Sequence, residues 1–123
     1  MAQVLTDSCA AAADDVQYAF VASRDGLVVA AASTPTQRDE DQTALRGSAI
    51  AAAAAGIGDH FIALSSRGGR LQSVLFEADR SCVAVLPLSS ALLLVVGGTQ
   101  ATSLGRLSAA ARRMVHALQT PAV

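Results

Sequence analysis

Residues 19–31, AFVASRDGLVVAA, hold two apolar runs joined by a Ser-Arg-Asp-Gly turn at 23–26. The runs are rich in strand-forming residues, and the Asp-Gly pair supplies the positive φ that a tight turn between two strands requires. The stretch therefore predicts a β-hairpin whose first strand begins at residue 16. This hairpin is the strongest local signal in the chain, and the other elements are placed around it.

Helices are predicted on both sides of the hairpin. Residues 3–13 are rich in alanine, a strong helix former, and residues 40–65 follow a long apolar pattern with Asp39 as its N-cap. Three strand-like runs come next and predict an antiparallel meander, at 71–78, 82–89 and 91–98. The first run alternates in polarity, as expected of an edge strand. The last is apolar throughout, as expected of a strand covered on both faces.

The final predicted element is an amphipathic helix that Thr102 or Ser103 caps. Its apolar face comprises Leu104, Leu107, Ala111, Met114 and Leu118. The predicted order is therefore α-β-β-α-β-β-β-α. A length of 123 residues allows one hydrophobic core, so residues 1–123 are expected to form a single domain.

The long predicted helix carries two apolar stripes when its side chains are placed at 100° per residue. The stripe with the large side chains is predicted to face the sheet: Ile50, Ala54, Ile57, Phe61 and Leu64. The other stripe is made almost entirely of small side chains: Leu45, Ala49, Ala52, Ala53, Gly56 and Ala63. Small residues let a second helix approach closely, so this stripe is predicted to meet a second copy of the chain. The alternative is that the alanines only propagate a helix whose outer face meets water.

Composition also favours self-association. The chain is 52% hydrophobic and 15% charged, with a mean hydropathy of +0.43, which is high for a soluble monomer. Gly56 and Gly58 each cost about 1 kcal/mol relative to alanine inside a helix, a cost that close packing would explain. An oligomer would bury the surplus apolar surface.

Charge and composition exclude several functions. A formal net charge of -1 favours neither nucleic acid nor an anionic membrane as a partner. All nine basic residues are arginine, so the chain has no lysine for a GxxxxGK[ST] phosphate loop or a Schiff base. No uninterrupted apolar run approaches about 18 residues, and the first residues do not resemble a signal peptide. We therefore expect a cytoplasmic protein that does not insert into a membrane.

No catalytic, metal-binding or cofactor-binding residue is predicted. Asp59 and His60 are adjacent, but neighbouring side chains on a helix diverge by 100° and do not form an acid–base pair. His116 stands alone in the last helix. Cys9 and Cys82 are far apart in the sequence, lack CxxC spacing and are expected to be buried thiols.

Taken in this order, the elements resemble the roadblock/dynein light chain family. The resemblance rests on the hairpin AFVASRDGLVVAA, on GIGDHF at 56–61 and on ATSLGRLSAAARRMVHAL at 101–118. It implies an α/β fold of the α+β sandwich type, with a five-stranded antiparallel sheet, the long helix on one face and the two terminal helices on the other. The first helix is shorter than in the family and the alanine run is nearly featureless, which leaves partner contacts hard to place.

The same resemblance implies a homodimer joined through the long helix and the third strand. In this chain the implied interface comprises Leu45, Ala49, Ala52, Ala53, Gly56, Leu71, Ser73 and Leu75. The chain looks most like bacterial members that serve beside Ras-like small GTPases, which implies a non-catalytic adaptor or regulator without an arginine finger. The candidate partner contacts are Arg46, His60, Arg67 and Arg70. The alternative function is a small-ligand sensor or signalling scaffold on a profilin-like or PAS-like sheet, which needs a concave pocket with convergent polar groups.

Overall fold

The computed structural model describes residues 1–33 and 40–120 of the chain. Within them the elements follow the predicted order: α1 (Ala2–Ala11), β1 (Val16–Ser23), β2 (Val28–Ser33), α2 (Glu40–Leu64), β3 (Val74–Glu77), β4 (Cys82–Pro87), β5 (Leu92–Gly98) and α3 (Leu104–Gln119). The N-cap predicted at Asp39 lies outside the described residues.

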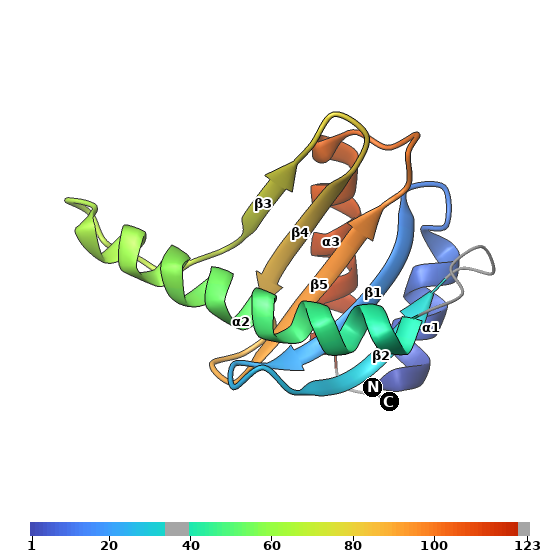
Figure 1. The fold of residues 1–123 in the computed structure, drawn as a ribbon, viewed down its shortest axis with the longest axis horizontal. Coiled ribbons are helices and arrows are strands. Elements are labelled where there is room, and N and C mark those ends of the chain that lie inside the picture. Colours follow the sequence, from blue (N-terminus) through green and yellow to red (C-terminus); the bar gives the residue numbers. More distant parts are fainter. Residues whose placement is uncertain (34–39, 121–123) are drawn as a thin grey trace.

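The strands form one antiparallel sheet in the order β2-β1-β5-β4-β3, with α2 across one face and α1 and α3 against the other (Figure 1). Strand β5 contributes to both cores, because Leu94 and Val96 pack towards α1 and α3 while Leu93 and Val95 pack towards α2. The predicted three-layer arrangement is confirmed. The prediction that the last strand is covered on both faces is also confirmed.

The predicted hairpin forms as β1 and β2. Gly26 has a φ of 90°, and its backbone N–H donates to the carbonyl of Ser23 at 3.0 Å. The Ser23 hydroxyl accepts from the Leu27 N–H at 3.1 Å. The turn residues therefore have the roles that the Ser-Arg-Asp-Gly sequence predicts, with glycine at the position of positive φ.

Strand β3 lies at one edge of the sheet, as its alternating polarity predicted. It is shorter than the predicted run, because residues 71–73 precede the first ladder pair, between Val74 and Val85. A Cβ added to Gly58 of α2 would lie 3.0 Å from both terminal methyl carbons of Leu71. The segment before β3 thus packs on α2 instead of extending the strand.

The predicted orientation of α2 is wrong. The side chains that face the sheet are small and buried, namely Ala44, Ser48, Ala51 and Ala55. The predicted sheet-facing stripe instead lies outside: Ile50 is 67% exposed, Ile57 57%, Phe61 69% and Leu64 83%, and Ala54 is half-buried.

The sheet surface explains this orientation. It already carries the bulky side chains of Phe20, Leu93 and Val95, so only small helix residues allow the two layers to close. A Cβ at Gly47 would lie 2.6 Å from Cζ of Phe20. The large residues of α2 are consequently left on its outer side.

The two interior glycines of α2 differ in their surroundings. Gly58 packs on Leu71 and Val74 of its own chain, whereas a Cβ at Gly56 would meet nothing within 4 Å. The close packing that the sequence suggested for both glycines is therefore found within the subunit for Gly58 only.

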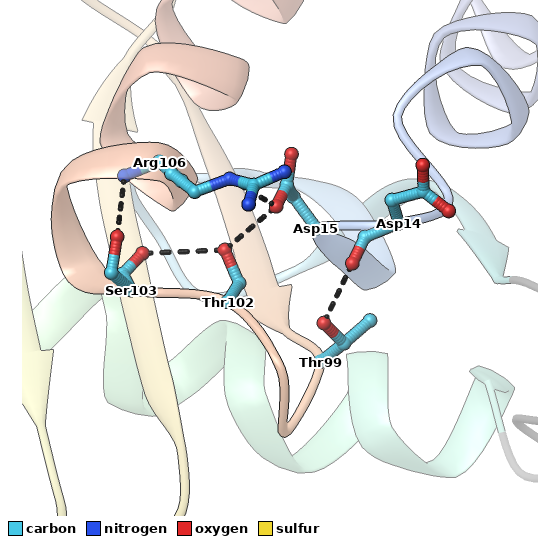
Figure 2. A network of polar contacts seen from close by, with 6 residues as sticks. All are labelled: Asp14, Asp15, Thr99, Thr102, Ser103 and Arg106. Atoms are coloured by element: carbon cyan, nitrogen blue, oxygen red, sulfur yellow. Dashed lines mark hydrogen bonds and ion pairs between the residues drawn. The ribbon is translucent and has the colours of Figure 1, made fainter.

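Helix α3 is held to the start of β1 by a polar cluster (Figure 2). Ser103 is its N-cap, and its hydroxyl accepts from the Arg106 N–H at 3.2 Å. Oδ1 of Asp15 accepts from the Thr102 hydroxyl at 3.0 Å and lies 3.0 Å from Nε of Arg106. The Thr99 hydroxyl donates to the backbone carbonyl of Asp14 at 2.9 Å. The cluster joins the segment before β1 to the segment after β5, far apart in sequence.

We expect Asp15→Ala to lower the free energy of unfolding by about 1–3 kcal/mol, because the Thr102 hydroxyl loses the carboxylate as an acceptor and Arg106 loses its ion pair. Asp14→Ala is the matched control, since Asp14 accepts through its backbone carbonyl, and its effect should stay within about 0.5 kcal/mol. Urea unfolding followed by circular dichroism measures both. Equal losses would show that the Asp15 carboxylate does not hold this joint.

Candidate interaction surface

Helix α2 is longer than the sheet is wide. Its 25 residues span about 37 Å at 1.5 Å per residue, whereas the outermost of five strands lie about 19 Å apart. Figure 1 shows the C-terminal part of α2 projecting past β3. This overhang is the C-terminal end of α2, where Phe61 and Leu64 are exposed, and Ile57 lies exposed one turn before them. It is an apolar segment with little sheet beneath it.

An apolar groove of about 260 Å³ lies between α2 and the sheet. It is lined by Thr43, Gly47, Ile50, Ala51 and Ala54 of α2, and by Tyr18, Phe20, Phe76, Val83, Val85 and Val95 of the sheet. The rings of Tyr18 and Phe20 stack with centroids 6.2 Å apart. Burial raises the pKa of the Tyr18 phenol, because the phenolate would be poorly solvated there. The groove lacks the convergent polar groups expected of a small-ligand sensor.

Strand β3 borders the groove and adds exposed apolar surface. Phe76 lines the groove and is 47% exposed, and Leu75 is 40% exposed. In the described part of the chain β3 pairs with β4 only, so the other edge of β3 offers open backbone N–H and carbonyl groups. The helix flank, the groove and the strand edge adjoin one another.

The interface residues predicted from the sequence fall in two places. Leu45, Ala49 and Ala53 are exposed on α2, and Ala52 and Gly56 are half-buried. Of the strand residues, Leu75 is exposed, while Leu71 and Ser73 are half-buried.

Helix α2 thus has two different flanks. A Cβ at Gly26 would lie 3.3 Å from the Cα of Ala49, so the small-residue flank looks towards the hairpin turn. Ile50 and Ala54 line the groove, so the large-residue flank looks towards β3. Sequence reasoning missed the second flank as a surface because it assigned that flank to the core. The number of small residues on the true inner face was the available signal.

The predicted partner contacts Arg46, His60, Arg67 and Arg70 are all exposed. Asp59 does not pair with its neighbour His60. Its Oδ2 lies 2.9 Å from Nη1 of Arg24 in the hairpin turn, which ties that turn to α2.

A second, more polar hollow of about 720 Å³ lies beside this ion pair. Its lining includes Arg70 together with Arg24 and Asp59, and it extends to the turn after β4. The Nε atom of Arg24 is buried without a hydrogen-bond partner. Arg67, Arg46 and His60 do not line this hollow.

In the described residues, no group of three or more His, Cys, Asp or Glu side chains lies close enough together to hold a metal ion. Both cysteines are buried, as expected. Burial raises the pKa of the Cys82 thiol, and the negative charge of Glu77 raises it further.

Residues Thr43–Leu64 of α2 are long and apolar enough to cross a membrane by length and composition, with a mean hydropathy of 1.3. In this structure the segment lies on the sheet, yet only 17% of its most apolar 18-residue stretch is buried. Half of the 22 residues of this segment are exposed within their own subunit.

These features define a three-layer α+β domain with one large apolar face formed by α2 and β3. The chain belongs to the Roadblock/LC7 domain family, whose model matches residues 3–97. No curated protein sequence matches the chain significantly.

Solved structures support the same fold. The Roadblock/LC7 domain from Streptomyces avermitilis superposes with a TM-score of 0.79 at 17% identity, over 97% of this chain and 94% of that one. The gliding protein MglB from Thermus thermophilus gives a TM-score of 0.70 at 20% identity, over 96% and 87% of the two chains. MglB from Myxococcus xanthus gives 0.70 at 17% identity, over 96% and 90%.

Proposed function

We propose that this chain is a non-catalytic, homodimeric adaptor of the bacterial cytoplasm that binds a Ras-like small GTPase and modulates its GTP hydrolysis or its localisation. The observation that carries the proposal is the exposed apolar flank of α2. The GTPase as partner is drawn from the resemblance to bacterial roadblock members, and MglB proteins stand among the structural neighbours.

The dimer is supported by the free-energy cost of leaving the large apolar side chains of α2 exposed to water. Burying an Ile, Phe or Leu side chain contributes about 1.5–3 kcal/mol each, and Ile50, Ile57, Phe61 and Leu64 are all more than half exposed. An apolar surface of this kind on a soluble domain marks an interaction site.

The open edge of β3 supports the same contact. Two β3 strands that pair antiparallel about a two-fold axis would satisfy their outer backbone groups and continue the sheet. The overhang of each α2 would then lie over the sheet of the other copy.

In this arrangement the two flanks of α2 have different partners. The second copy takes the large-residue flank with β3, so Ala53, Leu71, Ser73 and Leu75 remain in the proposed dimer interface. The hairpin-side flank, with Leu45, Ala49, Ala52 and Gly56, stays open in the dimer and is proposed as the GTPase-docking side. Arg46 and His60 border it and supply charged contacts. Arg67 and Arg70 are exposed in the segment that follows α2 and are proposed as further contacts.

We expect the wild-type chain to sediment as a dimer at about 10 μM and Ile57→Glu to sediment as a monomer. The substitution would bury an unpaired carboxylate in an apolar contact, which costs several kcal/mol and raises the dimer Kd about 100-fold or more. Ala109→Glu, on the exposed side of α3, is the control and should leave the dimer intact. A monomeric wild type, or a dimeric Ile57→Glu with unchanged affinity, would overturn the dimer.

We further expect the dimer to bind a Ras-like small GTPase of the source organism in one nucleotide state more tightly than in the other. Titration calorimetry with the GTPase loaded with GDP or with a non-hydrolysable GTP analogue measures this difference. Leu45→Glu should weaken the binding about tenfold or more while leaving the dimer unchanged, because Leu45 is 69% exposed on the hairpin-side flank.

Two outcomes would contradict this assignment. Absence of binding in both nucleotide states would show that a Ras-like small GTPase is not the partner. Dissociation of the dimer by Leu45→Glu or Gly56→Arg would return the small-residue flank to the dimer interface, where the sequence first placed it.

A further inference from the structure

The apolar groove and the overhang of α2 occupy opposite halves of the same helix. The helix residues that line the groove run from Thr43 to Ala54, and the exposed Phe61 and Leu64 lie near the C-terminal end of the helix. Within one chain this C-terminal end projects past β3 (Figure 1). Each subunit therefore has an apolar groove on one half of α2 and exposed large apolar side chains on the other half.

A two-fold axis exchanges these two halves. Ala53 and Ala54 are small, and Ile50 and Ile57 lie at equal distances on either side of them, so this point allows the closest crossing of two antiparallel α2 helices. Position 61 of one helix then lies opposite position 46 of the other, because each is about 11 Å from the crossing at 1.5 Å per residue. Arg46 itself does not line the groove, but Thr43 and Gly47 on either side of it do.

The groove suits an aromatic side chain. Its walls include the rings of Tyr18, Phe20 and Phe76, and aromatic rings pack favourably against one another. A cavity of about 150 Å³ is large enough to bind benzene, and this groove measures about 260 Å³. Phe61 is the aromatic residue of the overhang and is 69% exposed in its own subunit.

We propose that the Phe61 side chain of each copy occupies the groove between α2 and the sheet of the other copy. This inference rests on the proposed homodimer and deepens it, because each groove is completed only by a residue from the partner. The contact occurs twice, once in each direction across the axis.

The first test uses Phe61→Trp, since the chain has no tryptophan of its own. In the dimer the emission of the introduced indole should be blue-shifted and protected from acrylamide, and it should move to the solvent-exposed position in the monomeric Ile57→Glu background. Leu27→Trp is the matched control, because Leu27 is 67% exposed in the hairpin turn, outside the proposed dimer contact. Its emission should be solvent-exposed in both states.

The second test measures the dimer Kd of Phe61→Ala, Ala54→Leu and the double variant by sedimentation. Ala54→Leu fills the groove from within, so each single change should raise Kd about 10- to 100-fold, and the double change should raise it little further because both remove one contact. Ala109→Leu, on the exposed side of α3 and outside the proposed dimer contact, should leave Kd unchanged. Thermal unfolding in the Ile57→Glu background separates any effect on the subunit fold.

The outcomes separate this inference from the dimer itself. A stable dimer of Phe61→Trp whose indole is solvent-exposed, or fully additive losses in the double variant, would overturn the groove assignment and leave the dimer in place. A monomeric wild type would overturn both.

Discussion

The close contact between the α2 backbone and the Phe20 ring sets the character of the whole surface. With no side chain at Gly47, and with small side chains at Ala44, Ser48 and Ala51, the helix settles onto a sheet that already carries bulky groups. Volume taken by the sheet side chains is closed to the helix, so the large residues of α2 are turned outward. The apolar exterior therefore follows from how the interior is filled.

The length of α2 adds a second constraint. A helix that crosses the sheet and is longer than the sheet is wide must project beyond it. Strand β3 is the edge strand and has only four residues, so it does not cover the projecting part. Because the projecting residues are apolar, they form an exposed surface of the kind that marks an interaction site. If a second copy supplies the cover, folding and association are coupled, and the apparent stability of the domain will rise with its concentration.

Much of this fold could be predicted from local sequence. The Asp-Gly turn, the Ser103 cap, the alternating polarity of the edge strand and the apolar run of β5 each report conditions that act within a few residues. The facing of α2 could not be predicted in that way, because it depends on the side chains presented by three strands far away in the sequence. The ion pair between Arg24 and Asp59 and the bond from Thr102 to Asp15 are likewise invisible to local patterns, since they join segments 35 and 87 residues apart.

The error over α2 is informative about the site. Placing the large residues against the sheet assumes that a helix buries its bulk inside its own subunit, which is true when the opposing layer is flat or small. Here the opposing layer already carries the bulky side chains of Phe20, Leu93 and Val95, so the usual relation between size and burial is reversed, and two unlike flanks result. One flank is bulky and adjoins a groove and a strand edge, which suits permanent burial against a second copy. The other is small, smooth and bordered by Arg46 and His60, which suits a partner that binds and leaves, since small side chains bury little area and charged borders favour fast, salt-sensitive association.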